Sequence, residues 1–296
     1  MDGILNINKP AGNTSFSIVS IVKRLTGERR VGHAGTLDPI ASGVLPVCLG
    51  KGTRIVEFLL EASKVYRAQI ELGVATDTHD ANGSITRRGD YSTITMEQLE
   101  QALNSFRGLI QQIPPMFSAL KYKGKRLYDL AREGITVKRE SRAATIHRLE
   151  LLDFKPPLVA LKIECSRGTY IRSLAHDLGE LLGCGAHLKE LVRLSYGPFD
   201  IEAAVSPNQL EYAFSNNDWQ QLIYPVDTVL RNWTLVVVGD EQEQVIKNGG
   251  CVVMENSQIA DGSEKRCRAY NKEGCFLAVL YFDTERGQWQ PEKVFV

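Results

Sequence analysis

The sequence contains no hydrophobic run long enough to cross a membrane. Its longest uninterrupted apolar stretches, such as Val44–Leu49 and Leu235–Val238, fall far short of the roughly 20 residues that a spanning helix needs. The first residues, Met1–Asn6, carry neither the basic segment nor the long apolar segment of a secretory signal. These absences argue against a protein with membrane-spanning helices, and we expect a cytoplasmic protein.

Paired cysteines and metal-ligand spacings are also missing. The 6 cysteines are scattered without a C-x-x-C pair, and the 5 histidines form no H-x-x-x-H pattern. A disulfide framework, a zinc site and a redox motif are therefore disfavoured, and reduced structural thiols are expected. No metal and no cofactor is expected.

The chain has no net charge, because 35 basic residues balance 35 acidic ones, but the charges are unevenly distributed. Residues 107–148 hold ten Lys or Arg against three acids, interleaved with Phe117, Tyr122 and Tyr128. Charge alone is typical of a solvated face. Basic residues mixed with aromatic and flexible ones favour a surface that binds folded RNA.

Hydrophobic periodicity predicts strands and helices in irregular succession. Alternating apolar residues predict strands over Tyr66–Leu72 and Val159–Cys165, each with one solvated face. A capping box at Thr95–Gln98 and the apolar spacing from Tyr170 to Leu181 predict two helices. A further strand is expected over Gly3–Asn8, and a further helix from Thr14 or Ser15 to Gly27. The lack of a regular β-α-β order favours the α+β class with a mixed, mainly antiparallel central sheet.

The last part of the chain has a different pattern. Short strand-like segments at Leu235–Val238, around Val252, at Arg268–Tyr270 and at Phe276–Phe282 are separated by glycines, with a helix-like Glu241–Lys247 between them. This pattern predicts a small β-barrel module over residues 232–296, following a main domain over residues 1–231.

The segment Gly32–Pro39 has the composition of a tightly constrained loop. Asp38 stands directly before Pro39, which disfavours a helical conformation at the aspartate. Such a carboxylate could stabilise a turn, act as a nucleophile or bind a metal. Spacing alone favours the turn, then catalysis, and a metal last because no second acid lies nearby.

Gly32–Pro39 also resembles the aspartate-containing signature of the TruB family of pseudouridine synthases, which act on uridine 55 of tRNA. Other segments are similar to that family's motifs and follow in its order. They are Asn8–Gly12 with Thr14–Ser15, Lys64–Arg67, Leu72–Gly83, Gln112–Pro115 with Ser118–Lys121 and Gly124, and Arg167–Arg172. The resemblance implies a pseudouridine synthase fold and a PUA-like C-terminal module.

The resemblance implies a catalytic set. Asp38 would be the nucleophile, attacking either the ribose or the base, and Arg172 would pair with it and keep it anionic. Tyr66 would stack on the flipped uracil, with its phenol a candidate for the proton transfer from C5, and Leu191 would close the other side of the pocket. From spacing alone, a surface ion pair for Arg172, core packing for Tyr66 and a helix core for Leu191 remain alternatives.

The resemblance also implies residues that meet the RNA. His33 would wedge beside the extruded nucleotide, and Lys9 would support the N-terminal strand near the active loop. Asp77 and Asp80 would shape the RNA-facing pocket, or else cap a turn. A mobile basic insertion over residues 112–148, which contains Lys121, would grip the T-arm of tRNA.

Two features depart from the family pattern. The family usually has paired arginines after the pocket leucine, whereas this chain has Val192-Arg193, which leaves Arg193 as the remaining phosphate contact. Residues 232–296 hold ten acids against seven bases, which weakens the case for RNA binding there.

The expected activity is therefore the isomerisation of uridine 55 in the TΨC loop of tRNA, by a monomer without a protein partner. Three alternatives remain open at this stage. They are a tRNA-binding chaperone without turnover, a related synthase acting on another RNA, and an aspartate-nucleophile hydrolase of small molecules.

Overall fold

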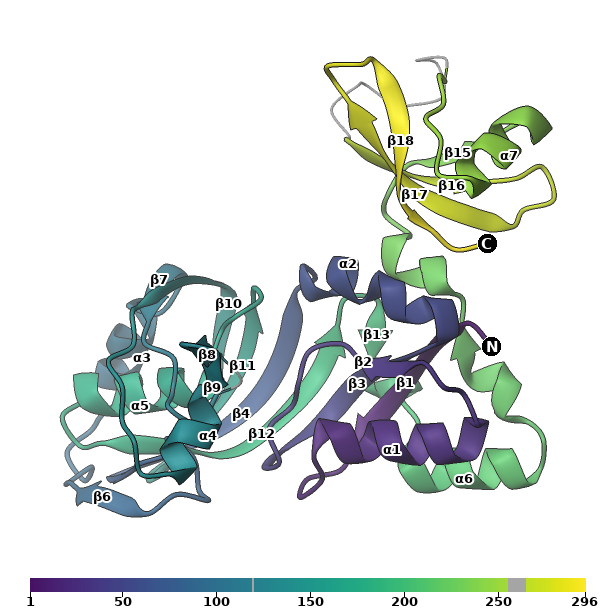
Figure 1. Ribbon diagram of the computed structural model, residues 1–296. Coiled ribbons are helices and arrows are strands. Elements are labelled where there is room, and N and C mark those ends of the chain that lie inside the picture. The colour runs from purple at the N-terminus through teal and green to yellow at the C-terminus, as the bar shows by residue number, and fades with distance from the viewer. Residues whose placement is uncertain (119, 255–264) are drawn as a thin grey trace.

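A computed structural model describes residues 1–118, 120–254 and 265–296. The chain folds around one long, curved sheet whose main path runs β14-β1-β3-β12-β4-β11-β10-β7 (Figure 1). Along this path β3 and β12 are parallel and the other neighbouring pairs are antiparallel. The predicted α+β class with a mixed, mainly antiparallel sheet is confirmed. The strands are β1 (Gly3–Lys9), β3 (Ala41–Leu49), β4 (Lys64–Leu72), β7 (Gly108–Gln112), β10 (Arg142–Lys155), β11 (Leu158–Cys165), β12 (Ala186–Tyr196) and β14 (Ile223–Tyr224), with β2 (Val31–His33) on β3 and β13 (Phe199–Asp200) on β12.

Strand β4 shows how the alternating sequence becomes sheet. Tyr66, Ala68, Ile70 and Leu72 are buried, whereas Arg67 is exposed. The strand pairs with β12 on one side and β11 on the other, so its buried face lies in the centre of the core. Burial of this apolar face is the main favourable term for the fold. The predicted strands over Tyr66–Leu72 and Val159–Cys165 are both confirmed.

The helices begin and end where capping residues stand. Helix α1 (Ser15–Thr26) starts at Thr14, whose hydroxyl accepts a hydrogen bond from the Ser17 amide, and ends at Gly27 with a φ of 65°. Helix α3 (Met96–Asn104) has the predicted capping box at Thr95. Helices α1 and α6 (Pro207–Ser215) lie together near the β1 end of the sheet, and α3 and α5 (Ile171–Leu181) lie near its β7 end (Figure 1). Shorter elements are η1 (Gly50–Ile55), α2 (Val56–Leu60), β5 (Val74–Thr76), β6 (Ile85–Arg88), η2 (Ile201–Ala203), η3 (Trp219–Leu222) and η4 (Val226–Leu230).

The basic segment leaves and rejoins the sheet at neighbouring positions, because Gln112 of β7 pairs with Arg142 of β10. Between them lie β8 (Lys121–Tyr122), β9 (Lys125–Arg126) and α4 (Leu127–Arg132), over a small apolar cluster of their own. The Gln112 side chain exchanges two hydrogen bonds with the Tyr170 backbone, which anchors the start of the segment beside α5. Ala119, part of one motif quoted above, lies outside the described residues.

The C-terminal part forms a separate sheet in the order β15-β16-β17-β18. Its elements are β15 (Leu235–Val237), α7 (Asp240–Lys247), β16 (Arg266–Tyr270), β17 (Phe276–Asp283) and β18 (Gln288–Val294), around a core that includes Ile246 and Trp289. Val252 makes only an isolated bridge to Trp289, although a strand was predicted around it. Residues 255–264 of the predicted module lie outside the described part of the chain.

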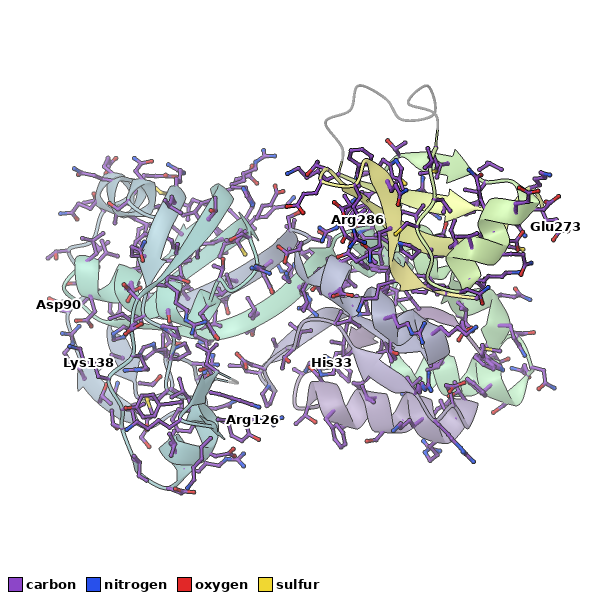
Figure 2. All side chains as sticks on the ribbon, turned by 45° about the horizontal axis from the view of Figure 1, so that its top comes forward. His33, Asp90, Arg126, Lys138, Glu273 and Arg286 are labelled. Atoms are coloured by element: carbon purple, nitrogen blue, oxygen red, sulfur yellow. The ribbon has the colours of Figure 1, made fainter. Side chains whose placement is uncertain are left out.

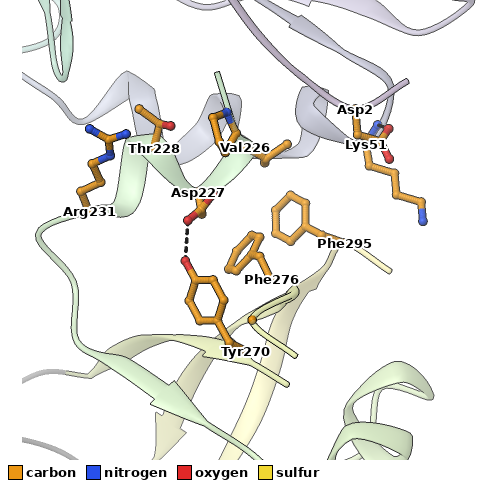
Figure 3. A pocket seen from close by; sticks show the side chains of 11 residues that line it. Asp2, Lys51, Val226, Asp227, Thr228, Arg231, Tyr270, Phe276 and Phe295 are labelled. Carbon is orange, nitrogen blue, oxygen red and sulfur yellow. Dashed lines mark hydrogen bonds between the residues drawn. The ribbon is translucent and has the colours of Figure 1, made fainter. Parts of the chain in front are cut away.

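This C-terminal sheet packs against the main domain near α2 (Figure 1). Phe295 and Val279 share an apolar cluster with Phe58, and Lys293 forms an ion pair with Glu57 at 2.9 Å. A pocket of about 440 Å³ lies at this junction, and on its wall the Tyr270 hydroxyl donates to the Asp227 carboxylate (Figure 3). The two parts are therefore joined by side-chain packing as well as by the chain.

In the described ranges, no helix is both long enough and apolar enough to span a membrane. All six cysteines are described and none forms a disulfide.

Gly179 of α5 provides a test of the packing between that helix and β12. A Cβ at this position would lie 2.0 Å from the Ala186 nitrogen, so Gly179→Ala should destabilise the protein by about 1–3 kcal/mol although alanine favours helix. Urea unfolding would measure the change. The matched control is Gly32→Ala, whose Cβ would come no closer than 3.9 Å to Thr53; equal stability of both variants would contradict the packing argument.

Candidate active site

Asp38 lies in the loop between β2 and β3, which other segments hold in place. The Ser15 hydroxyl donates to the Leu37 carbonyl at 3.1 Å and accepts from the Leu37 amide at 2.9 Å. The Gly12 amide donates to the Pro39 carbonyl at 2.7 Å. The start of α1 and the turn before it therefore fix the backbone on both sides of the carboxylate.

Arg172, the second residue of α5, forms an ion pair with Asp38, with 2.8 Å between Nε and Oδ2. Its side chain is only 5% exposed, whereas that of Asp38 is 38% exposed. The guanidinium also lies 3.6 Å from the Asp80 carboxylate, and it donates to the carbonyls of Thr78 at 3.2 Å and Phe117 at 2.8 Å. Several partners thus hold the Arg172 guanidinium in place, while the Asp38 carboxylate remains partly accessible.

Burial raises the pKa of Asp38 above its ordinary value, and the nearby Asp80 acts in the same direction. The charge of Arg172 is the main opposing influence, and Lys9 adds to it. Ionisation of Asp38 therefore depends on Arg172, which is the physical basis of the role predicted for this arginine.

A pocket of about 280 Å³ opens beside the carboxylate. Tyr66 and Leu191 line it from the neighbouring strands β4 and β12, and each is 7% exposed. Leu191 lies on a strand, so the alternative of a helix core is wrong. The cavity combines an aromatic and an aliphatic wall with one anion and its guanidinium partner, which suits a flat base held next to a reactive carboxylate.

Five of the predicted RNA-facing residues do not line this pocket; they are His33, Lys9, Asp77, Asp80 and Lys121. His33 is half-buried at the end of β2, and burial lowers its pKa. Asp77 is exposed and accepts a hydrogen bond from the Ser84 amide, which is a turn-capping contact. Lys121 is exposed on the basic insertion, where Figure 2 also shows Arg126 and Lys138.

Lys9 is fully buried, and burial lowers its pKa to about 8. Its ammonium donates to the carbonyls of Pro10 and Asn13, so it stabilises the turn that contacts the catalytic loop. This agrees with a supporting role and does not provide a contact to RNA.

Arg193 requires a correction, because it was expected to contact an RNA phosphate. Its side chain is 0% exposed, and the guanidinium donates to the carbonyls of Val44 at 2.6 Å and Gly35 at 2.9 Å. It also lies over the ring of Tyr196, 4.9 Å from the centroid. Arg193 therefore holds the loop that carries Asp38, and although it lines the pocket, its buried guanidinium is engaged by backbone carbonyls and does not present the exposed phosphate contact that was expected.

Lys64 and Tyr170, for which the sequence indicates no site role, also line the pocket. Burial lowers the pKa of Lys64 to about 8, and Arg193 contributes to the shift. Lys64 could have been found from its period-two spacing to Tyr66, which places both on one face of β4. Tyr170 was assigned to the apolar face of a helix, but it is the N-cap residue of α5.

Within the described residues, no group of three or more His, Cys, Asp or Glu side chains is arranged to hold a metal ion. The side chains that line this pocket offer the Asp38 carboxylate, arginine guanidinium groups, the Lys64 amine, and phenol and hydroxyl groups.

The chain matches two family models. The N-terminal domain of the TruB family pseudouridylate synthases matches residues 23–171, and the C-terminal domain of tRNA pseudouridylate synthase B matches residues 172–231. The fold and the site thus define a pseudouridine synthase. The chain belongs to the TruB family of pseudouridylate synthases.

Among its relatives is a protein of Dehalococcoides mccartyi named tRNA pseudouridine synthase B, which is 46% identical over 100% of this chain and 97% of its own length. A protein of the same name from Clostridium kluyveri is 42% identical over 94% of this chain and 95% of its own. Among solved structures, a Cbf5-Nop10-Gar1 complex contains a chain that matches with a TM-score of 0.76 and 27% identity, over 99% of this chain and 85% of that one. The predicted pseudouridine synthase fold is confirmed.

Proposed function

We propose that this protein converts uridine 55 in the TΨC loop of tRNA to pseudouridine, with Asp38 as the nucleophile. The observation that carries the proposal is the ion pair between Asp38 and the buried Arg172 beside a base-sized pocket. Relatives whose names specify tRNA are up to 46% identical to this chain, whereas the chain in the Cbf5-Nop10-Gar1 complex is 27% identical. The higher identity to the tRNA enzymes favours tRNA over another RNA as the substrate.

The reaction exchanges one bond for another without an external group. The N1–C1′ bond of uridine breaks, the base turns, and a C5–C1′ bond forms; C5 then loses a proton, and N1 carries one in the product. Asp38 attacks either C1′ of the ribose or C6 of the base, and both routes return the carboxylate unchanged. Tyr66 stacks on the base, and its phenol lies on the pocket wall as a candidate for the proton transfer from C5.

The target base must leave its helix to reach Asp38. Extrusion costs a few kcal/mol, and stacking on an aromatic ring returns about 1–3 kcal/mol. Tyr66 on one wall and Leu191 on the other offset most of that cost, and His33 occupies the space next to the extruded nucleotide.

Residues 1–231 form the catalytic unit in this proposal. The basic insertion over residues 112–148 grips the T-arm, and residues 232–296 form a PUA-like module that makes a secondary contact with the RNA. The proposal takes the protein to act as a monomer in the cytoplasm.

Incubation of the purified protein with unmodified tRNA, without added cofactor, followed by mapping of pseudouridine, tests the proposal. Product at position 55 alone is expected. Product at other positions would indicate a different RNA specificity. Tight tRNA binding without product in a single-turnover assay would instead favour a chaperone.

Lys121 tests the proposed grip, because it is exposed on the insertion. Lys121→Gln should weaken tRNA binding several-fold and reduce the slope of log Kd against log salt concentration by about 1, as expected for one lost phosphate contact. Filter binding over a salt series measures both quantities. Lys23→Gln, an exposed lysine on α1, is the matched control; equal effects of the two substitutions would contradict a localised grip.

A further inference from the structure

His79 and His176 form a stacked pair close to Arg172. Their ring centroids are 3.9 Å apart and their planes differ by 6°. His79 comes from the turn between β5 and β6, and His176 comes from α5. The Nδ1 atoms of both rings are buried and have no hydrogen-bond partner among the described residues, so the two side chains meet through their ring faces.

This stack joins the same two segments that Arg172 joins. His176 lies four residues after Arg172, hence one turn further along the same face of α5. His79 lies between Thr78 and Asp80, and both of these contact the Arg172 guanidinium. Two side chains of α5 therefore contact three consecutive residues of one turn.

The backbone of this turn is constrained as well. His79 has a φ of 63°, in the left-handed region that few side chains other than Asn, Asp and His adopt. Its carbonyl accepts a hydrogen bond from the Leu188 amide of β12 at 3.0 Å. The turn is thus docked on the sheet through its backbone and on α5 through the His79 ring.

The charges around the pair favour a neutral His79. Burial lowers the pKa of His79 to about 3, and His176, Arg172 and Arg139 of the basic insertion act in the same direction. The nearby acid, Asp80, is engaged by Arg172 and by the Thr78 hydroxyl. At neutral pH the His79 ring therefore adds no positive charge beside Arg172.

We infer that His79 and His176 are positioning residues, whose stacking fixes the Thr78–Asp80 turn against Arg172 and so sets the orientation of the guanidinium toward Asp38. The inference rests on the proposed role of Arg172. Neither histidine lines the pocket, so each acts through the arginine and not on the RNA base.

The test is the kinetics of His176→Ala and of His79→Asn. Asparagine is chosen at position 79 because it tolerates the left-handed backbone while removing the ring. The single-turnover rate constant, followed by tritium release from tRNA labelled at C5 of uridine, should fall roughly ten-fold in each variant, because small misplacements of catalytic groups are costly. The tRNA Kd should stay within about two-fold of the wild-type value, because neither histidine lines the pocket. The acid limb of the pH-rate profile should move to higher pH, since a displaced Arg172 protects the Asp38 carboxylate less well.

Rescue by a conservative variant completes the test. His176→Phe retains a flat ring and should recover most of the rate, whereas the exposed Leu181→Ala on the same helix should behave as wild type. Unchanged rates in both histidine variants, or slower turnover with an unmoved acid limb, would overturn the inference. Arg172→Met, assayed in parallel, distinguishes the role of Arg172 from that of the stack. If Arg172→Met stays active, the proposed role of Arg172 is wrong. If Arg172→Met is inactive but both histidine variants stay active, only the role of the stack is wrong.

Discussion

Asp38→Asn is expected to abolish pseudouridine formation while leaving tRNA affinity nearly unchanged. Asparagine keeps the size of the side chain and one oxygen that can face Arg172, but it removes the charge that makes the carboxylate a nucleophile. Loss of a covalent catalyst typically lowers turnover by about 10³-fold or more. Tritium release and mapping of position 55 measure the activity, and filter binding measures the affinity.

The matched control for this substitution is Asp77→Asn. Asp77 is also a loop aspartate, but it is exposed and caps a turn away from the pocket, so its variant should keep most of the activity. An Asp38→Asn protein with wild-type yield in a single turnover would refute the nucleophile assignment. Loss of tRNA binding together with activity would show that Asp38 is needed for the RNA grip instead.

Arg172→Met is expected to have the second largest effect, on activity and on stability together. The substitution removes the cation that opposes the raised pKa of Asp38, so the carboxylate becomes protonated at higher pH than before. Because catalysis needs the anion, the acid limb of the kcat/KM profile should shift upward, and part of the lost activity should return as the pH increases. Asp80, whose side chain is 8% exposed, loses its ion-pair partner, which should destabilise the protein by about 3–5 kcal/mol.

A pH-rate series from about pH 5 to pH 9 and urea unfolding measure these effects. Arg172→Lys serves as the comparison, since it keeps the charge and loses the fork that reaches both carboxylates and two carbonyls. It should preserve the position of the acid limb better than it preserves the rate. Identical profiles for wild type and Arg172→Met would show that the arginine does not control the ionisation of Asp38.

Local features of the sequence were sufficient for most of the fold. The strand at Tyr66–Leu72 and the capped helix after Thr95 depend on neighbours within a few residues, and both are present at the predicted positions. The role expected for Asp38 was not local in this sense, because spacing alone favoured a turn, and the resemblance to the TruB family rested on motifs spread from Asn8 to Arg172.

The partners of several charged residues could be identified only from the tertiary structure, because those partners lie far away in the sequence. Arg193 follows the pocket leucine in sequence and suggested a phosphate contact, yet its partner Val44 is 149 residues away and the side chain is buried. The same holds for Asp80, which reaches Arg172 while the similar Asp77 caps a turn. The stack of His79 on His176 likewise joins segments that no short motif connects.

The sequence by itself therefore determined the class of fold and the positions of most regular elements, and through its family resemblance it pointed to Asp38 as the nucleophile that we propose. Only the tertiary structure showed that Arg172 also pairs with Asp80 and that Lys9 and Arg193 are buried. The physical reason is that periodicity and capping are short-range properties, whereas the cost of burying a charge depends on the partners that the folded chain brings to it.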